Sequence, residues 1–212
     1  MARDLSPKCK QCRREGRKLF LKGERCYTSK CALTKRKYPP GFHGPKGYPR
    51  QSEYSLELRQ KQQLRRFYGI LEAQLKNYFE KAKKQQGDIG ENLLCLLEKR
   101  LDNVVWRAGF AISRREARQL VNHGNILVNE RRVDIPSYQV KVGDLIKVKP
   151  KQRIVKKVKQ NIEKVLSLDE RNKVSWLSLD KDNLEVKVLS QPKPEDLPKD
   201  FNLRLIVQFY SR

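Results

Sequence analysis

The sequence has no long apolar run and very little histidine. No stretch of apolar residues is long enough to cross a bilayer. The first residues, MARDLSPK, lack the apolar core of a signal peptide. We therefore expect no membrane partner, no export and a reducing, cytoplasmic environment. The two histidines, His43 and His123, lie in different regions, and no phosphate-binding loop or dinucleotide fingerprint is present. These absences argue against an enzyme and against a small-molecule substrate.

Acidic residues are scarce relative to basic ones. The 212 residues include 48 Lys and Arg but only 24 Asp and Glu, which gives a formal net charge of +24. Residues 1–50 are the most unbalanced, because their only acidic residues are Asp4, Glu15 and Glu24. A chain with this excess repels itself when it compacts, which predicts an anionic partner. Nucleic acid, an anionic membrane surface and acidic proteins all fit that description.

Four of the five cysteines lie close together, with the spacing C-x2-C-x13-C-x4-C. They are Cys9, Cys12, Cys26 and Cys31. Two close pairs separated by a loop suit a tetrahedral site of four thiolates, in which no position is left open for catalysis. The spacing favours one structural Zn²⁺, with a four-cysteine iron–sulfur cluster as the alternative. Free thiols or disulfides are the other interpretation. A metal would fold a basic segment that has few apolar residues to bury.

The pattern along the chain predicts an α+β protein. Residues 1–50, rich in Pro and Gly near their end, indicate an extended arm with turns. The helical stripe from Glu53 to about Gln86 predicts a helix with a break or bend at Gly69. A second helix is expected over 91–109, with Cys95 beside its apolar stripe as a small buried hydrophobe. Short strands follow over 125–129, 131–134 and 138–149, and the last stretch, LRLIVQFY (203–210), alternates like a final strand.

Further apolar patterns fill the second half of the chain. Ile154, Val158, Ile162 and Val165 have helical spacing, whereas Leu184, Val186 and Val188 alternate as in a strand. Trp176 is expected in a core segment, and residues 191–200 form a Pro-rich connector.

The helix expected over 113–123 carries the clearest binding pattern. Ser113 and Glu116 have capping-box spacing, and Gly124 is expected to end the helix. Arginines on a rigid helix suit paired contacts with phosphate oxygens of folded RNA. The candidate RNA-binding residues here are Arg114, Arg115, Arg118, Gln119, His123, Arg131 and Arg132. Lys61, Arg65 and Arg66, on the expected exposed side of the earlier helix, are candidates for the same role.

Several stretches resemble one known family. RLDNVVWRAGFAISRREARQLVNHGNILVNERRVDIPSYQVKVGDLIKV (100–148) resembles the S4 RNA-binding module. KGERCY (22–27), YPPGFHG (38–44), LRQKQQLRRFYGI (58–70) and IVQFYSR (206–212) resemble the bacterial family of small-subunit ribosomal protein S4, in its zinc-binding cysteine form. Glu130 departs from the family, which usually has Gly there. Because Glu tolerates positive φ poorly, the turn at Asn129–Glu130 is expected to differ in type.

The resemblance implies a structural component of the small ribosomal subunit, in the cytoplasm. Such a protein is a primary binder of 16S ribosomal RNA that nucleates assembly of the subunit body. It contacts neighbouring small-subunit proteins, lies near the mRNA entry channel and contributes to translational accuracy. Lys46 and Arg50 become candidates for the channel lining. The implied domain map has a metal-binding arm (1–50), a helical lobe (51–91 with 192–212) and the RNA-binding module with its extension (92–191).

Two other functions compete with this interpretation. Arg-Leu-Asp at 100–102 superficially resembles the signature around the catalytic aspartate of pseudouridine synthases, some of which carry the same module. We expect Asp102 instead to be a surface residue in an ion pair or hydrogen bond. A zinc-binding nucleic-acid regulator is the second alternative, although no recognition helix follows the cysteines.

Overall fold

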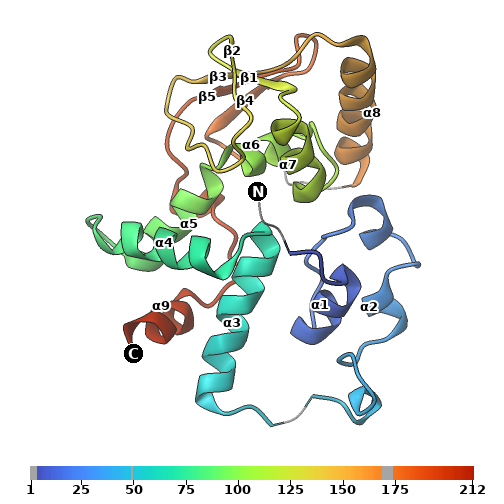
Figure 1. Ribbon diagram of the computed structural model, residues 1–212, viewed down its shortest axis with the longest axis vertical. Helices are drawn as coiled ribbons and strands as arrows, with labels where there is room; N and C mark the ends of the chain where they lie inside the picture. The colour runs from blue at the N-terminus through green and yellow to red at the C-terminus, as the bar shows by residue number, and fades with distance from the viewer. Residues whose placement is uncertain (1–3, 49, 169–173) are drawn as a thin grey trace. The chain divides into compact units, whose positions relative to one another are not determined.

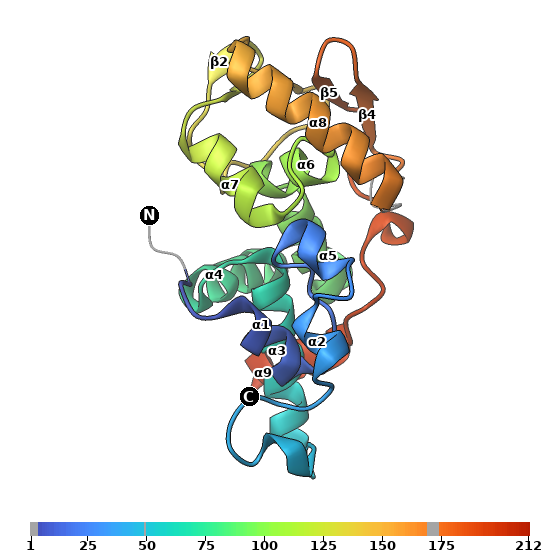
Figure 2. The same cartoon turned by 90° about the vertical axis from the view of Figure 1, so that its right-hand side faces the viewer.

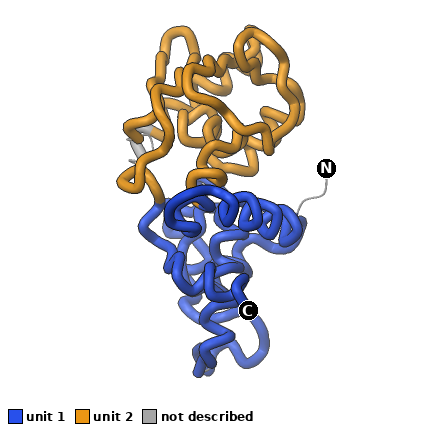
Figure 3. The backbone as a smooth tube through the Cα atoms, turned by 90° about the vertical axis from the view of Figure 1, so that its left-hand side faces the viewer, with its two compact units in different colours: residues 1–93, 198–212 blue, residues 94–197 orange. Residues whose placement is uncertain are grey.

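The chain folds into two compact units. The computed structural model describes residues 4–48, 50–168 and 174–212 (Figure 1, Figure 2). Unit 1 comprises the described part of Met1–Leu93 together with Pro198–Arg212, and unit 2 comprises the described part of Leu94–Leu197 (Figure 3). The class is α+β, as predicted. The three-part map of residues 1–50, 51–91 with 192–212, and 92–191 stays a prediction.

Residues 4–48 of unit 1 contain short helices where an extended arm was expected. They are α1 (Lys8–Glu15), η1 (Gly23–Cys26), α2 (Ala32–Lys35) and η2 (Gly44–Lys46). The expectation failed because α1 has no apolar stripe: its buried residues are Gln11 and Cys12. Backbone hydrogen bonds still close its first turn, since the N–H of Gln11 donates to the carbonyl of Pro7 at 3.4 Å.

The rest of unit 1 is built from α3 (Glu53–Tyr68), α4 (Glu72–Lys83) and α9 (Leu203–Ser211). Gly69 separates the first two with φ of 65°, so the predicted break is confirmed. The predicted strand over 203–210 is wrong. Asn202 accepts a hydrogen bond from the N–H of Leu205 and starts a helix there, and the ring of Tyr210 stacks on Phe79 at 4.6 Å.

The helix predicted over 91–109 is two helices, α5 (Ile89–Glu98) and α6 (Leu101–Arg107). The chain breaks at Lys99–Arg100 because it pairs there with another segment of unit 2. The N–H of Leu101 donates to the carbonyl of Tyr138 at 2.9 Å, and the N–H of Val140 donates to Lys99 at 3.0 Å. Backbone groups used in that way cannot continue an α-helix.

Unit 2 is centred on a five-stranded antiparallel sheet with the order β2-β1-β3-β5-β4. The strands are β1 (Ile126–Val128), β2 (Arg131–Arg132), β3 (Leu145–Val148), β4 (Leu177–Asp180) and β5 (Glu185–Val188). Two longer helices join it: α7 (Arg114–Asn122) and α8 (Gln152–Leu168). A short helix, η3 (Pro194–Asp196), lies in the predicted Pro-rich connector.

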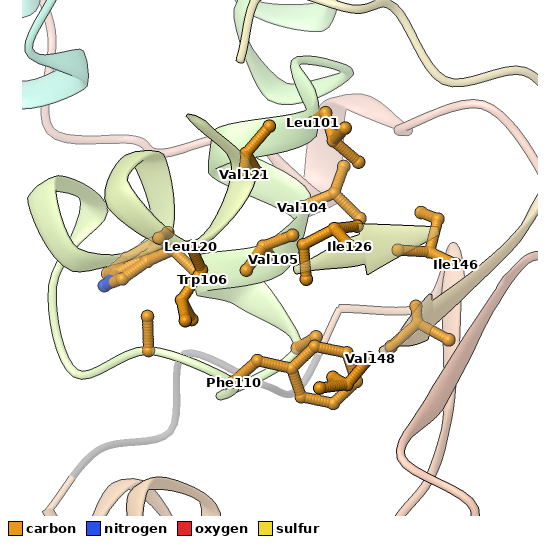
Figure 4. Packing of buried hydrophobic residues seen from close by; sticks show 14 of the residues in the cluster. Leu101, Val104, Val105, Trp106, Phe110, Leu120, Val121, Ile126, Ile146 and Val148 are labelled. Atoms are coloured by element: carbon orange, nitrogen blue, oxygen red, sulfur yellow. The ribbon is translucent and has the colours of Figure 1, made fainter. Parts of the chain in front are cut away.

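One face of this sheet is buried under the helices. Ile126 and Ile146 lie in a buried core (Figure 4), to which Val186 also belongs. Helices α6, α7 and α8 complete this core (Figure 2). The alternating pattern explains this arrangement, because every second residue of a strand lies on the same face. Trp176 is fully buried, and Val158, Ile162 and Val165 are buried along α8, as their spacing predicts.

The β1–β2 turn keeps the geometry that glycine would favour. Asn129 and Glu130 have φ of 49° and 64°, so both central residues are left-handed, which is the condition for a type I′ hairpin. The expectation of a different turn type is therefore wrong. Asn129 holds the turn, because its side-chain oxygen accepts from the N–H of Leu145 at 2.9 Å and its amide donates to Asp144 at 2.9 Å. The carboxylate of Glu130 lies 2.7 Å from the ammonium of Lys147.

A pair of substitutions at Glu130 separates backbone strain from the loss of this ion pair. Both Glu130→Gly and Glu130→Ala remove the carboxylate, but only Gly relieves the left-handed conformation. We expect the Gly variant to be more stable than the Ala variant by about 1 kcal/mol. Urea unfolding followed by tryptophan fluorescence measures the difference, because both tryptophans, Trp106 and Trp176, lie in unit 2. Equal stability of the two variants would show that the turn relaxes.

Candidate nucleic-acid interface

Helix α7 presents a polar face because its apolar face is anchored in the core. Ser113 caps its start by accepting a hydrogen bond from the N–H of Glu116 at 3.3 Å. The Glu116 carboxylate reaches back to the N–H of Ile112 at 3.0 Å and pairs with Lys157 of α8 at 2.6 Å. Val121 is fully buried (Figure 4). The helix is therefore fixed at its start and along one side, and the opposite side faces solvent.

Several residues that the sequence predicts to bind RNA are exposed, and they come from α7 and from β2. Arg115, Gln119 and His123 are exposed on α7, and Arg131 and Arg132 are exposed on β2. Gly124, just after α7, packs directly against the guanidinium of Arg132: a Cβ at Gly124 would lie 2.2 Å from its Nε. This contact joins the end of the helix to the hairpin. We call the exposed set Arg115, Gln119, His123, Arg131 and Arg132 the arginine surface.

Arg114 and Arg118 have a different position from the one predicted. Arg118 was predicted to bind RNA, but it is only 9% exposed, whereas Arg115 on the same helix is exposed. Arg114 is half-buried: its Nε donates to the side-chain oxygen of Asn103 at 2.8 Å, and its guanidinium lies 3.6 Å from the ring centre of Trp106. These contacts tie the start of α7 to α6, and so they fix the position of the arginine surface.

The predicted exposed side of α3 is covered. Lys61 is 5% exposed, and its ammonium lies 2.7 Å from Glu72 and 4.1 Å from the ring centre of Phe209. Arg66 pairs with the buried carboxylate of Glu15 in α1. Arg65 is half-buried, and its Nε donates to Gln62 at 2.9 Å. The prediction that these cations are exposed is wrong for Lys61, because α1 packs on one side of α3 while α4 and α9 pack on others.

Other cations of the chain are also exposed, including one set that the sequence did not lead us to predict. Lys46 and Arg50 are exposed, as a role in a channel lining requires. Helix α8 carries a line of exposed cations that the prediction left out: Arg153, Lys156, Lys157 and Lys159. The signal was present in the sequence as IVKKVK, where basic residues fill the positions between the buried apolar ones.

The four clustered cysteines surround one small cavity in unit 1. Its volume is about 20 Å³, and its lining includes Cys9, Cys12, Cys26 and Cys31. Among the described residues, no three His, Cys, Asp or Glu side chains form a metal-ligating group. Burial, followed by the neighbouring thiols, raises the pKa of Cys12 to about 11 despite a hydrogen bond from the backbone of Leu19. The four sulfurs are thus close enough to influence each other's ionisation.

Backbone N–H groups already point at these sulfurs. The N–H of Lys22 donates to Sγ of Cys26 at 3.4 Å. Burial alone would raise the pKa of Cys31, but hydrogen bonds from the backbone of Thr34 and Leu33 outweigh it and lower that pKa. Such donors stabilise the thiolate form, which is the form that binds a metal. Four thiolates are by their chemistry a donor set for Zn²⁺, although the described side chains do not form a metal-ligating group in this structure. Cys95, by contrast, is half-buried in unit 2, where its thiol faces the carbonyl of Pro192 at 3.5 Å.

Asp102 is a structural residue in this fold. It is 3% exposed, so the predicted surface position is wrong. The predicted ion pair is present: Arg100 donates from Nε to one carboxylate oxygen at 3.0 Å and from a terminal nitrogen to the other at 2.7 Å. A carboxylate held in that way is not available to attack a substrate.

The fold and the arginine surface together define a nucleic-acid-binding protein with a helix–β binding module. Residues 3–98 match the model for the ribosomal protein S4/S9 N-terminal domain, and residues 99–146 match the S4 domain. The chain is 53% identical to small ribosomal subunit protein uS4 of Thermus thermophilus, 52% to that of Acetivibrio thermocellus and 50% to that of Nitrosospira multiformis. Each match covers 100% of both chains. The chain belongs to the uS4 family.

Within residues 4–48, 50–168 and 174–212, no helix has both the length and the apolar character needed to span a bilayer.

Proposed function

We propose that this protein is a structural, non-enzymatic component of the small ribosomal subunit that binds 16S ribosomal RNA. The observation that carries the proposal is the arginine surface, in which α7 and the β1–β2 hairpin are held together by the contact of Gly124 with Arg132. The relatives at 50–53% identity are named small ribosomal subunit proteins, which supports a place for this chain in the small ribosomal subunit. The chain would act in the cytoplasm and early in the assembly of the subunit body.

The chemistry of the arginine surface suits the backbone of folded RNA. Guanidinium groups bind phosphate oxygens in pairs, and the groups here project from a helix and a hairpin whose positions are fixed by packing. Phosphates and 2′-hydroxyls are the groups that a folded RNA presents most readily to a protein surface. The exposed cations of α8 extend the positive charge of unit 2, and the net charge of +24 supplies long-range attraction.

Two finer roles are inferred from membership of the uS4 family and from the exposed positions of Lys46 and Arg50. We assign Lys46 and Arg50 to the lining of the mRNA entry channel, where they would contact the messenger. Contacts with neighbouring small-subunit proteins would connect this chain to translational accuracy. Both assignments rest on family membership and on the exposed positions of the two side chains.

We also propose that Cys9, Cys12, Cys26 and Cys31 hold one structural Zn²⁺. A cavity of about 20 Å³ has room for about one water molecule, which favours a single ion over an iron–sulfur cluster. When bound, the ion would supply cross-links between α1, η1 and the start of α2. The surrounding Lys and Arg residues offset the charge of the thiolates.

The test of RNA binding replaces three arginines of the arginine surface with glutamine: Arg115, Arg131 and Arg132. Each lost phosphate contact should make the slope of log K against log salt shallower by about 1, so we expect a change of about 2–3. Filter binding to a 16S RNA junction over a salt series measures the slope. The matched control neutralises three exposed lysines at α4: Lys76, Lys83 and Lys84. If both triple variants lose affinity equally, general charge and not this surface carries binding.

A further inference from the structure

Unit 1 contains a polar cavity that none of the roles above uses. It has a volume of about 280 Å³ and lies between the end of α1, the segment around Tyr48 and the first half of α3. Its lining is Arg14, Glu15, Gly16, Tyr48, Gln51, Arg59, Gln60 and Gln63. The lining is rich in amide and guanidinium groups and contains an aromatic ring. This combination differs from that of the arginine surface, which consists of arginine, glutamine and histidine side chains.

Gln63 contributes an amide side chain to the wall of this cavity. Gln63 as a residue is only 6% exposed, yet its amide makes no hydrogen bond with the described residues and remains accessible to solvent. Its neighbours on α3 differ, because Gln62 pairs with Arg65 and Gln60 accepts from the N–H of Asn202. The amide of Gln63 can therefore pair with a ligand that offers both a donor and an acceptor.

Tyr48 forms a fixed wall of the same cavity. Its hydroxyl donates to the carbonyl of Arg13 at 2.7 Å. Its ring packs against Gly16, where an added Cβ would meet the hydroxyl oxygen at 3.2 Å. The side chain is nevertheless 43% exposed. An aromatic ring that is held at its tip and open on one side can stack with a flat ligand.

The charge of the cavity favours a nucleotide. The carboxylate of Glu15 is already shared by Arg59, at 3.2 Å, and Arg66, so two guanidinium groups offset one negative charge. Arg14 adds a third, exposed guanidinium at the rim. The cavity is thus cationic around a neutral amide, and this arrangement suits a base that carries a phosphate.

We propose that this cavity receives a single unstacked nucleobase of the bound RNA. Gln63 reads the edge of the base, Tyr48 stacks on its face, and Arg14 contacts the adjoining phosphate. Proteins recognise RNA sequence mostly through unstacked bases of this kind. Adenine is the best match, because its N6 amine and N7 offer a donor and an acceptor to a glutamine amide. The proposal rests on the proposed function and adds a base-specific site to it.

The experiment compares Gln63→Leu with wild type on a 16S RNA junction. A paired amide–base contact contributes about 1–3 kcal/mol of discrimination, so we expect the affinity to fall about 5- to 100-fold. Chemical probing at nucleotide resolution should show one adenine that wild-type protein protects and the variant does not. The salt slope should stay unchanged, because no phosphate contact is lost. Gln62→Leu, on the same helix but outside the cavity, is the matched control.

Each outcome decides the proposal. Wild-type affinity together with an unchanged protection pattern in the Gln63→Leu variant would overturn it. If the Leu variant does not fold, Gln63→Glu keeps the size of the side chain and loses the donor, so it must also lose protection of the same base. Should wild-type protein fail to bind the junction at all, the proposed function itself fails. Binding by wild type with equal binding by the variant rejects only the base site.

Discussion

Asp102→Ala should destabilise unit 2 by about 3–5 kcal/mol, which is a large part of the stability of a typical domain. The reason is the position of Arg100, which is 1% exposed and gives two N–H groups to this carboxylate. Removing the carboxylate leaves a buried positive charge without its counter-charge. The same pair fixes the junction of α5 and α6, where Arg100 precedes the first residue of α6 and forms a β-bridge with Gln139.

A double-mutant cycle shows whether the loss comes from the pair. Arg100→Met and Asp102→Ala should each be costly, while the double variant should lose less than their sum, since it buries no charge. Urea unfolding followed by the fluorescence of Trp106 and Trp176 reports unit 2. Asp102→Asn is the conservative control and should fall between wild type and Asp102→Ala. A change below about 1 kcal/mol in Asp102→Ala would mean that water reaches the guanidinium.

The features that the sequence predicts well are those that depend on neighbouring residues alone. Ser113 caps α7, Gly69 ends α3 with a positive φ, and Val158 and Ile162 form the buried stripe of α8. Caps, left-handed glycines and regular stripes leave a local pattern because the interactions span only a few positions along the chain. Arg115, Arg131 and Arg132 could be predicted as exposed cations for the same reason.

The features that the sequence does not predict depend on packing between distant segments. The stretch 203–210 fits both a strand and a helix, and its contacts with α3 and α4 favour the helix. The break at Arg100 depends on residues 138–140, and the burial of Lys61 depends on Glu72, Phe209 and Tyr210. Gln63 could not be singled out either, since a glutamine on a basic helix is ordinary until its surroundings are known.

Removing the proposed Zn²⁺ should have the largest effect of all, and this effect should fall on residues 8–46. Structural zinc sites in small domains contribute about 10–16 kcal/mol of apparent binding free energy at neutral pH, and this energy is available to fold the segment. Helix α1 buries Gln11 and Cys12 and no large apolar side chain, so little else stabilises it. After chelation we expect rapid hydrogen exchange and proteolysis within residues 8–46. The fluorescence of both tryptophans should stay unchanged, because they lie in unit 2.

The fifth cysteine provides a matched control for this experiment. Cys26→Ser removes one of the four sulfurs that line the small cavity, whereas Cys95→Ser removes a thiol of unit 2 that faces a carbonyl. We expect one metal ion per chain in wild type and in Cys95→Ser, and weak or no binding in Cys26→Ser. Elemental analysis gives the count, and a colourless protein without iron separates zinc from an iron–sulfur cluster. Metal-free protein whose arm remains protected from exchange would contradict the site, because the arm would then fold through its own packing.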